Sequence, residues 1–433
     1  MSDYKTYPGR EIFPIKAEPA CLLKWSWSSI WLETAKTSSC HRTSQDSIDP
    51  DNFDNFHNLP SKVKARQDML DGQWPGRGCE YCKNVETHGG VSDRQMTLSR
   101  QHGADKIPPE LFVDSTATTV TPTILEIYFN NTCNLSCIYC GPSLSSKWNE
   151  EINKFGAIKV DKVTIKSLFR PGNTRYEKML QDLWKYLETN DRYKVIRHFN
   201  FLGGEPLLQK ELDDTLEFWK KHPNPSLTFN MISNIMIPHK LFVDKMEKFQ
   251  KLIQDQCILK VDVTASLDCW GPQQVYVRHG LDLNVWTKNF EYMLNQSGST
   301  MSVHSCITAL TIKTMPTLIK KINYWNSLLP SDKFIEHIFD FVIGDENKEL
   351  GLHPCVFGPG VFDDDFDRIL LVMPENNECQ RSAKKQMEGL ANFVKNSIRD
   401  SKKIKNLKLY LDELDNRRNT KWHKLFGWLR NID

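Results

Sequence analysis

The chain has 433 residues, of which 39% are hydrophobic and 25% are charged, a balance typical of a globular protein that can bury a sizeable core. At this length two or three structural units are expected. The formal net charge is +2 and there is no long basic block, so nucleic acid has no electrostatic advantage as a partner.

No targeting or membrane-spanning pattern is found in the sequence. The first residues, MSDYKTYPGREIFPIK, lack the apolar stretch of a secretory signal, and no run approaches the ~20 apolar residues of a membrane span. We therefore expect a cytoplasmic protein that needs no membrane as a partner. In a reducing compartment, its 12 cysteines are better explained by metal binding or catalysis, where they cluster, than by disulfides.

Residues 1–95 are predicted to form a small first unit with little core. Residues 21–33 alternate like a strand or hairpin arm, and residues 61–74 have the pattern of a short helix. A unit this poor in apolar residues needs an additional crosslink, such as a bound metal, to be stable. The candidates are its cysteines, Cys21, Cys40, Cys79 and Cys82. Their spacing alone suits either structural zinc or an iron–sulfur cluster with only protein ligands. Residues 96–121, with prolines and threonines, are expected to be a linker.

From residue 122 to residue 345, strand-like runs alternate with amphipathic helical runs. This alternation predicts an α/β fold in which helical crossovers join parallel strands. The expected strands are 123–132, 195–206, 226–234, 257–268, 300–310 and 334–344. The expected helices are 143–156, 173–190, 210–223, 238–255, 285–298 and 314–329. Residues 346–433 are expected to be a partly helical C-terminal extension, with one helix in 363–400 and another in 408–430.

The most informative stretch is CNLSCIYC, residues 133–140. Cys133, Cys137 and Cys140 form a C-x3-C-x2-C array directly after the first expected strand. Three thiolates on one short loop can hold three irons of a cubane cluster and leave the fourth iron open to a substrate or cofactor. Without a nearby histidine, the same three cysteines would make a poor structural zinc site.

This array, with Tyr139 just before its last cysteine, resembles the radical SAM enzymes. Matching motifs follow in the same order: LGGEP at 202–206, ISN at 232–234, SLD at 266–268, and then Arg278. The resemblance implies a partial (β/α)6 barrel of TIM-like form that carries a [4Fe-4S] cluster on the three cysteines. It also implies that S-adenosylmethionine binds the open iron and is cleaved by one electron to methionine and a 5′-deoxyadenosyl radical, which abstracts hydrogen from a substrate.

The same resemblance implies roles for single residues in binding S-adenosylmethionine. Gly203 and Gly204 would let the backbone approach the methionine moiety, because glycine lacks a Cβ atom. Glu205 would accept hydrogen bonds from its ammonium group, and Arg278 would pair with its carboxylate. The other candidates are the backbone of Tyr139, for the adenine edge, and the side chains of Asn234, Ser266 and Asp268, for ribose or carboxylate contacts.

The first unit contains the pattern C…W…C…R…GxWP…C-x2-C, which is similar to the auxiliary-cluster modules called SPASM or Twitch. The resemblance implies a Twitch-like domain before the barrel, with a second [4Fe-4S] cluster on Cys21, Cys40, Cys79 and Cys82. Because its ligands would all come from protein, this cluster would transfer electrons rather than coordinate a substrate.

Many enzymes with such modules modify ribosomally made peptides, so a peptide substrate is expected, with crosslinking, epimerisation or splicing as outcomes. The alternative substrate is a small molecule such as a sugar, a nucleotide or a cofactor precursor. The alternative class is a non-catalytic protein that binds a cluster or zinc. The expected partners are an electron donor, such as flavodoxin or ferredoxin, and a separate leader-recognition protein.

Overall fold

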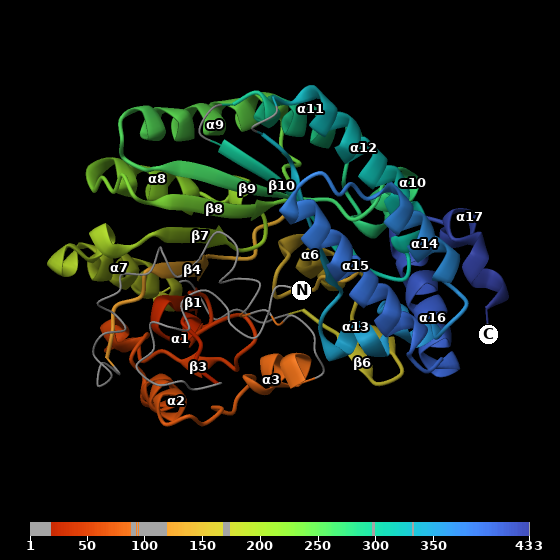
Figure 1. Cartoon of the computed structure of the whole chain (residues 1–433), viewed down its shortest axis with the longest axis horizontal. Helices are drawn as coiled ribbons and strands as arrows, with labels where there is room; N and C mark the ends of the chain where they lie inside the picture. Colours follow the sequence, from red (N-terminus) through yellow and green to blue (C-terminus); the bar gives the residue numbers. More distant parts are fainter. Residues whose placement is uncertain are drawn as a thin grey trace.

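The computed structural model describes residues 19–87, 92, 94, 119–167, 174–296, 299–330 and 333–432. Most of the predicted linker, 96–121, lies outside these residues. The described chain is organised on a nine-stranded sheet with the strand order β11-β10-β9-β8-β7-β4-β1-β2-β3 (Figure 1).

The sheet contains the predicted run of parallel strands. Adjacent members of this run pair in parallel from one end to the other. Their bounds are β4 (Ile124–Tyr128), β7 (His198–Leu202), β8 (Thr228–Ser233), β9 (Lys260–Ser266), β10 (Ser299–Ile307) and β11 (Glu336–Phe341). Each starts within three residues of the start of its expected segment, so the prediction of a mixed α/β fold with a parallel sheet is confirmed.

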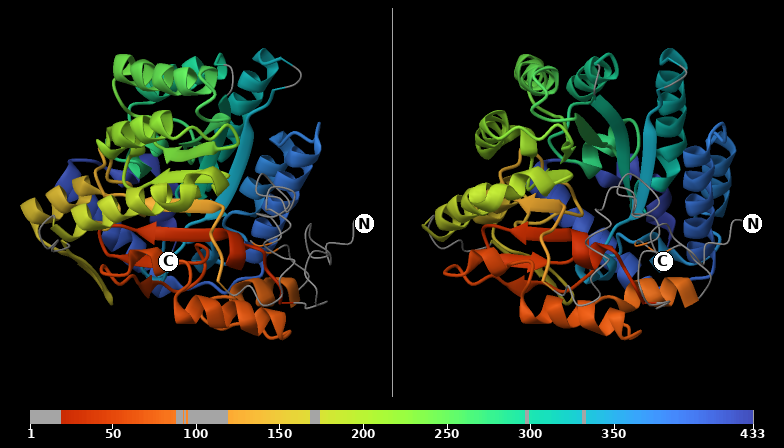
Figure 2. Two further views of the ribbon diagram at one scale, coloured as in Figure 1. Left: turned by 90° about the vertical axis from the view of Figure 1, so that its left-hand side faces the viewer. Right: turned by 60° about the vertical axis from the view of Figure 1, so that its left-hand side comes forward.

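Helices connect these strands, and most of them lie along one side of the sheet, whereas α6 and α10 pack in a second apolar core (Figures 1 and 2). They are α6 (Ser146–Phe155), α7 (Thr174–Glu188), α8 (Glu211–Lys221), α9 (His239–Gln254), α10 (Pro272–Val277), α11 (Leu283–Leu294) and α12 (Met315–Leu328). Each helix buries one apolar stripe, as in α9, where Phe242, Met246 and Phe249 are buried. A small antiparallel hairpin, β5 (Ile158–Val160) and β6 (Val163–Ile165), follows α6.

Side chains alternate between the two faces of each strand, so one face of the sheet is apolar and the other is polar. In β9, Val261, Val263 and Ala265 are completely buried in the main apolar core. The residues between them, Asp262 and Thr264, point to the opposite face. We call this opposite face the polar face. It is formed by the same strands whose carboxyl ends carry the predicted site residues.

The first unit joins this sheet directly. Strand β1 (Trp27–Trp31) pairs in parallel with β4, and β2 (Lys36–Ser38) and β3 (Asp46–Ser47) add antiparallel strands. The strand expected in 21–33 is confirmed only for β1, because the preceding residues form a short helix, α1 (Leu23–Ser26), stabilised by a hydrogen bond from the Ser26 hydroxyl to Leu22 O. The unit also contains α2 (Pro60–Leu70), where a helix was expected, and α3 (Glu80–Thr87).

The C-terminal extension is mostly helical and packs into a second apolar core. Its helices are α13 (Asp345–Glu349), α14 (Asp363–Val372), α15 (Glu378–Lys395), α16 (Ser401–Arg418) and α17 (Trp422–Leu425). The segment 363–400, expected to hold a helix, contains two, α14 and α15, with Pro374 between them, where proline cannot continue a helix. The helix expected in 408–430 also ends early, because Asn419 adopts a left-handed conformation after α16.

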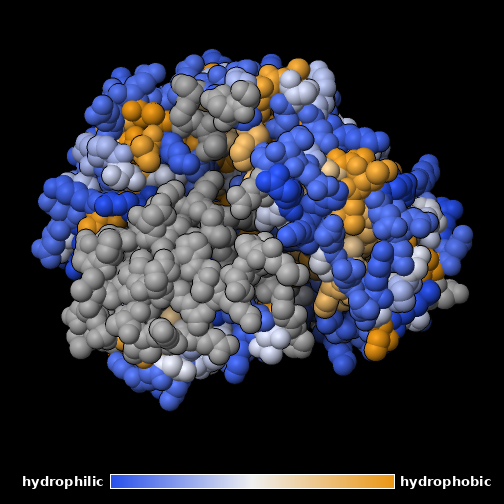
Figure 3. Space-filling model, viewed as in Figure 1, coloured by the Kyte–Doolittle hydropathy of each residue, from blue (hydrophilic) through white to orange (hydrophobic). Residues whose placement is uncertain are grey.

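Helix α15 covers the outer edge of the sheet. The side chain of Gln386 donates a hydrogen bond to Phe339 O of β11 at 2.9 Å, which satisfies part of the free edge. Exposed apolar side chains are found on the same extension, with Leu371 83% and Ile398 90% exposed, and Figure 3 shows hydrophobic surface on this side of the molecule. No helix in the described part of the chain has both the length and the apolar character needed to cross a bilayer.

Candidate functional site

The cysteine loop, residues 133–140, follows β4 at the edge of the sheet where the other parallel strands also end. Cys137 is buried, and Cys133 and Cys140 are half-buried. Distant parts of the chain hold the backbone of this loop by hydrogen bonds. These run from Ser136 N to His279 O (3.0 Å), from Ile138 N to Val277 O (2.9 Å), from Trp148 Nε1 to Cys137 O (2.9 Å) and from the Tyr410 hydroxyl to Ile138 O (2.7 Å).

The three thiols of this loop influence one another. Burial is the main cause that raises the pKa of each thiol, and it raises the pKa of Cys140 to about 12. The neighbouring Cys137 raises the pKa of both Cys133 and Cys140 further, since a thiolate disfavours a second negative charge beside it. A metal that binds these thiols must displace their protons.

The cysteine loop can be compared with the requirements of a metal ion and of a cluster. Within the described ranges, no group of three or more His, Cys, Asp or Glu side chains converges on the position of one metal ion. In a cubane cluster, by contrast, each thiolate binds a separate iron, so the thiolates need not converge on one ion. The all-sulfur donor set of the loop is the kind that selects iron–sulfur clusters over hard cations. The donor set of the cysteine loop is thus compatible with a [4Fe-4S] cluster, and its predicted role as three ligands of such a cluster stays a prediction.

Gly203 and Gly204 follow β7 and cross the backbone of residues 130–132. An ideal Cβ atom on Gly204 would lie 2.4 Å from Thr132 O, and one on Gly203 would lie 2.5 Å from Asn130 O. The backbone N of Gly204 donates to Asn130 O at 2.8 Å. Glycine is therefore required here because two backbone segments touch. The predicted approach of S-adenosylmethionine to these glycines stays a prediction beside this structural requirement.

The Glu205 carboxylate is completely buried and links the ends of β7 and β8. It accepts hydrogen bonds from the Ser233 hydroxyl (2.6 Å), from Asn234 N (2.7 Å) and from Leu207 N (3.1 Å). Burial raises the pKa of Glu205 to about 7, while these hydrogen bonds act in the opposite direction. Its oxygen atoms are thus largely engaged within the protein, and its predicted contact with an ammonium group remains a prediction.

Asn234 connects the end of β8 to the cysteine loop. Its Nδ2 atom donates to Asn134 Oδ1 at 2.9 Å and lies 4.0 Å from the Cys133 sulfur. Ser266 is buried at the end of β9, in register with His304 of β10. Of these predicted residues, Asn234 is therefore the one brought into contact with a predicted iron ligand.

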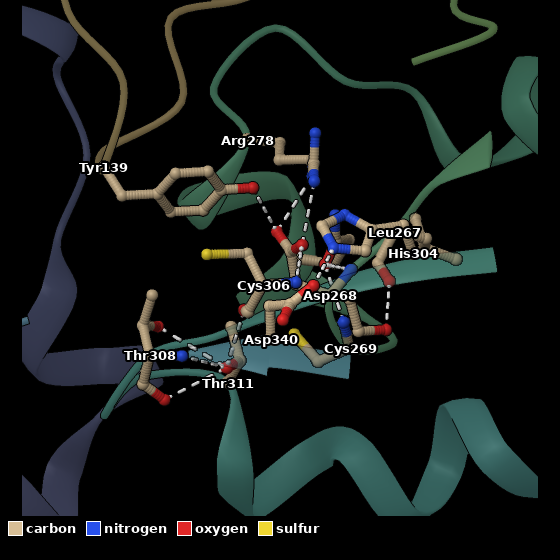
Figure 4. A network of polar contacts seen from close by, with 12 residues as sticks. Tyr139, Leu267, Asp268, Cys269, Arg278, His304, Cys306, Thr308, Thr311 and Asp340 are labelled. Atoms are coloured by element: carbon tan, nitrogen blue, oxygen red, sulfur yellow. Dashed lines mark hydrogen bonds and ion pairs between the residues drawn. The ribbon is translucent and has the colours of Figure 1, made fainter. Parts of the chain in front are cut away.

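Asp268 and Arg278 meet in a buried network at the ends of β9 and β10 (Figure 4). Arg278 Nε and Nη2 each lie 2.8 Å from one carboxylate oxygen of Asp268. The hydroxyl of Tyr139 donates to the same carboxylate at 2.8 Å, and the backbone N of Cys306 donates to it at 3.0 Å. The sequence predicted that both side chains contact S-adenosylmethionine; in the structure they contact each other. Their predicted contacts with S-adenosylmethionine stay predictions.

The cysteines of the first unit come together from three separate segments. Burial raises the pKa of Cys21 to about 12, the nearby Arg94 guanidinium lowers it, and Cys40, Cys79 and Cys82 each raise it further. Cys21 and Cys79 are buried in a small apolar cluster, with Cys40 packed against it. The structure thus gathers the four predicted ligands, whereas their identity as iron or zinc ligands stays a prediction.

A buried cation accompanies these cysteines. Lys24 is 6% exposed, and its ammonium group lowers the pKa of Cys79 by its charge and by a hydrogen bond, against the dominant raising effect of burial. Among the described residues, no carboxylate forms an ion pair with Lys24. A thiolate beside Lys24 would be stabilised by this ammonium group.

Sequence reasoning missed the polar residues inside the strands. Glu126 of β4 and Asn200 of β7 are both buried on the polar face, and His304 Nε2 lies 3.0 Å from Asp340 Oδ2 on the same face. The backbone N of Cys306 also lies in the network with Asp268. The signal was present in the sequence, because a charged or amide residue recurs at alternate positions of otherwise apolar strands.

Comparison with solved structures gives distant similarities. The chain resembles native anSMEcpe with bound AdoMet, with 17% identity and a TM-score of 0.32 over 56% of each chain. It also resembles TYW1 with a lysine–pyruvate adduct bound, with 17% identity and a TM-score of 0.30 over 62% of this chain and 73% of the TYW1 chain. A third is native anSMEcpe with bound AdoMet and the Cp18Cys peptide, with 15% identity and a TM-score of 0.30. The similarity to the first anSMEcpe structure thus spans little more than half of its length.

No family model matches the chain, and no curated protein matches it.

Proposed function

We propose that this protein is a radical SAM enzyme with a [4Fe-4S] cluster on Cys133, Cys137 and Cys140. The observation that carries the proposal is the cysteine loop itself, held by hydrogen bonds at the carboxyl edge of a parallel sheet, where α/β folds place their active sites. On this proposal, β4 and β7–β11 are the strands of a partial (β/α)6 barrel of the TIM type.

When bound, the cluster would supply an electron that cleaves S-adenosylmethionine and yields the 5′-deoxyadenosyl radical. The chain itself would position and shield the reacting groups. Asn234, next to Cys133, and Tyr139, within the Asp268 network, connect the loop to β8 and β9. These links would hold the loop in one geometry while the site excludes water.

We further propose that the substrate is a peptide and that the first unit is a Twitch-like domain with a second [4Fe-4S] cluster. Support comes from the sequence pattern of this unit and from the clustering of Cys21, Cys40, Cys79 and Cys82 beside the buried Lys24. The second cluster would relay electrons, delivered by a donor such as flavodoxin or ferredoxin. A separate leader-recognition protein would present the peptide.

The test is anaerobic reconstitution of the full chain with iron and sulfide, followed by dithionite and S-adenosylmethionine. We expect 5′-deoxyadenosine and methionine, measured by chromatography with mass detection. Cys133→Ala should abolish both products. The matched control is Cys257→Ala, which removes a buried cysteine from the apolar core and should leave the products unchanged. Iron-loaded protein that forms no 5′-deoxyadenosine would overturn the proposal and favour a non-catalytic metal-binding protein.

The substrate class needs a separate measurement. With deuterated candidate peptides, we expect deuterium to appear in 5′-deoxyadenosine, because the radical takes hydrogen from its substrate. If deuterium is transferred from a small molecule and from none of the peptides, that molecule replaces the peptide as the proposed substrate. The proposed enzyme class would then be unchanged.

A further inference from the structure

A buried carboxylate lies on the polar face, at the point where the first unit joins the parallel strands. Glu126 of β4 is 7% exposed and stands between Ser29 of β1 and Asn200 of β7, each of them its partner in register. The Ser29 hydroxyl donates to Glu126 Oε1 at 2.7 Å. Three neighbouring strands thus present polar side chains at one level of the sheet.

This carboxylate has neutral hydrogen-bond donors around it, and the positive charge that acts on it is that of His41. Within the described ranges, no lysine or arginine forms an ion pair with Glu126. Burial raises its pKa, and hydrogen bonds from Ser29, Tyr128 and Asn200 and the positive charge of His41 lower it. A buried carboxylate is costly unless a cation or several donors satisfy it, so a further cationic group would stabilise it.

A second acceptor faces the same region. The Oδ1 atom of Asn200 is buried and has no hydrogen-bond partner, although the residue is only 8% exposed. Buried polar atoms in native proteins are nearly always satisfied, so an unpartnered one points to a missing group that donates hydrogen bonds. Glu126 and Asn200 therefore offer acceptors, side by side, to a donor that the described part of the chain does not supply.

Aromatic rings adjoin these acceptors. Trp31 and Tyr128 lie two residues further along β1 and β4, opposite each other in register and stacked with 4.8 Å between ring centroids. Both rings are half-buried. A carboxylate beside aromatic rings is a typical arrangement for an ammonium or guanidinium group, because ring faces also attract cations.

The strands β1 and β4 connect the region around Glu126 to both cysteine sets. Strand β1 begins beside the first set, since Trp27 packs in the same apolar cluster as Cys21 and Cys79. Strand β4 leads directly into the cysteine loop at its other end. Glu126 and its neighbours therefore lie on the two adjacent strands that run between the first-unit cysteines and the loop at 133–140.

We propose that Glu126, Asn200, Trp31 and Tyr128 form a substrate subsite for an alkylammonium or guanidinium group, such as the side chain of a lysine or arginine in the substrate. The inference rests on the proposed function in that it takes the polar face to be where the substrate binds. It adds a substrate chemistry: a cationic side chain bound beside the site of hydrogen abstraction.

The test is calorimetric titration of the anaerobically purified full chain with n-pentylamine and with pentylguanidine. We expect both cations, or one of them, to bind, and 1-pentanol, of the same length and without charge, to bind at least about tenfold more weakly. The stronger of the two cations identifies whether the subsite prefers an ammonium or a guanidinium group. Equal binding of pentanol and the cations would overturn the proposal.

Variants locate the binding. Glu126→Gln, which keeps the shape and removes the charge, should weaken cation binding at least about tenfold. Asp213→Asn, which removes a carboxylate on the exposed surface of α8, is the matched control and should not change it. Should the Glu126 variant fail to fold, Asn200→Ala decides, because it removes the second acceptor of the subsite and loses one hydrogen bond, that to Glu126. Unchanged affinity for n-pentylamine in that variant would overturn the subsite.

The outcome is separable from that of the proposed function. A protein that cleaves S-adenosylmethionine but binds neither cation overturns the subsite alone. A protein that binds n-pentylamine through Glu126 but forms no 5′-deoxyadenosine supports the subsite and overturns the enzyme class.

Discussion

Asp268 and Arg278 form a buried ion pair with two hydrogen bonds, Nε to Oδ2 and Nη2 to Oδ1, both at 2.8 Å. Asp268 follows β9 and Arg278 follows α10, so the pair closes the turn of chain that contains this short helix. Because Asp268 is completely buried, its charge depends on Arg278.

Arg278→Met should therefore lower the free energy of unfolding by about 3–5 kcal/mol, since it leaves an uncompensated carboxylate in the interior. Urea denaturation measures the effect. Adding Asp268→Asn should restore part of the loss, because the stranded charge is then removed. The control is Lys248→Met, which breaks an exposed pair with Asp213 and should cost no more than about 1 kcal/mol. A loss equal to that of the control would contradict the assigned burial of the pair.

Gly204→Ala should destabilise the protein by about 1–3 kcal/mol, because the new Cβ atom would overlap the backbone oxygens of Asn131 and Thr132, which cannot move independently of the cysteine loop. Thermal unfolding and iron content together measure the result, and both should fall. Gly141→Ala is the matched control: it directly follows Cys140 and has open space around its Cβ position. Similar losses in both variants would show that the loop tolerates no side chain at all, rather than that two backbones cross at Gly204.

Much of the fold could be predicted from the sequence because it rests on local periodicity. Strand β9 shows why: Val261, Val263 and Ala265 alternate with polar residues, and alternation of this kind identifies a strand without knowledge of its neighbours. The cysteine loop could likewise be recognised from one short stretch of sequence. The break between α14 and α15 was missed, although Pro374 gives a local reason for it.

The partners of the site residues could not be predicted, because they depend on which strands become neighbours. Nothing local indicates that Arg278 turns to Asp268, or that β1 pairs with β4 and so places Ser29 beside Glu126. The glycine-rich turn after β7 was recognised by its sequence. Its reason, the contact with residues 130–132, required the three-dimensional arrangement.

His57 should make the first unit sensitive to acid. Its Nε2 atom lies 2.9 Å from Trp25 O, and burial, with the charges of Arg66 and Lys62, holds the pKa of His57 well below its ordinary value of 6.5. The folded protein thus keeps His57 neutral, while the unfolded chain takes up a proton below pH 6.5. Its stabilising contribution is complete above that pH and is lost as the pH falls, by up to about 1.4 kcal/mol per pH unit.

The measurement is the free energy of unfolding between about pH 7 and about pH 5. In His57→Gln the side chain can still donate to Trp25 O but cannot ionise, so the variant should lose less stability over this range than the unaltered protein. Replacing the exposed His423 in the same way is the control and should leave the slope unchanged. An identical slope in the His57 variant would contradict the neutral, buried state assigned to this ring.

Iron content should separate the two cysteine sets. If both hold [4Fe-4S] clusters, the reconstituted chain carries about eight irons, and each set accounts for about four of them. Cys133→Ala and Cys79→Ala should then each remove about four irons, whereas Cys257→Ala, in the apolar core, should remove none. Zinc in the first unit would instead leave about four irons in the unaltered chain, with zinc lost only from the Cys79 variant. Because Lys24 donates to Cys79, Lys24→Met should also weaken metal retention by the first set against a chelator, while Lys83→Met, exposed on α3, should not.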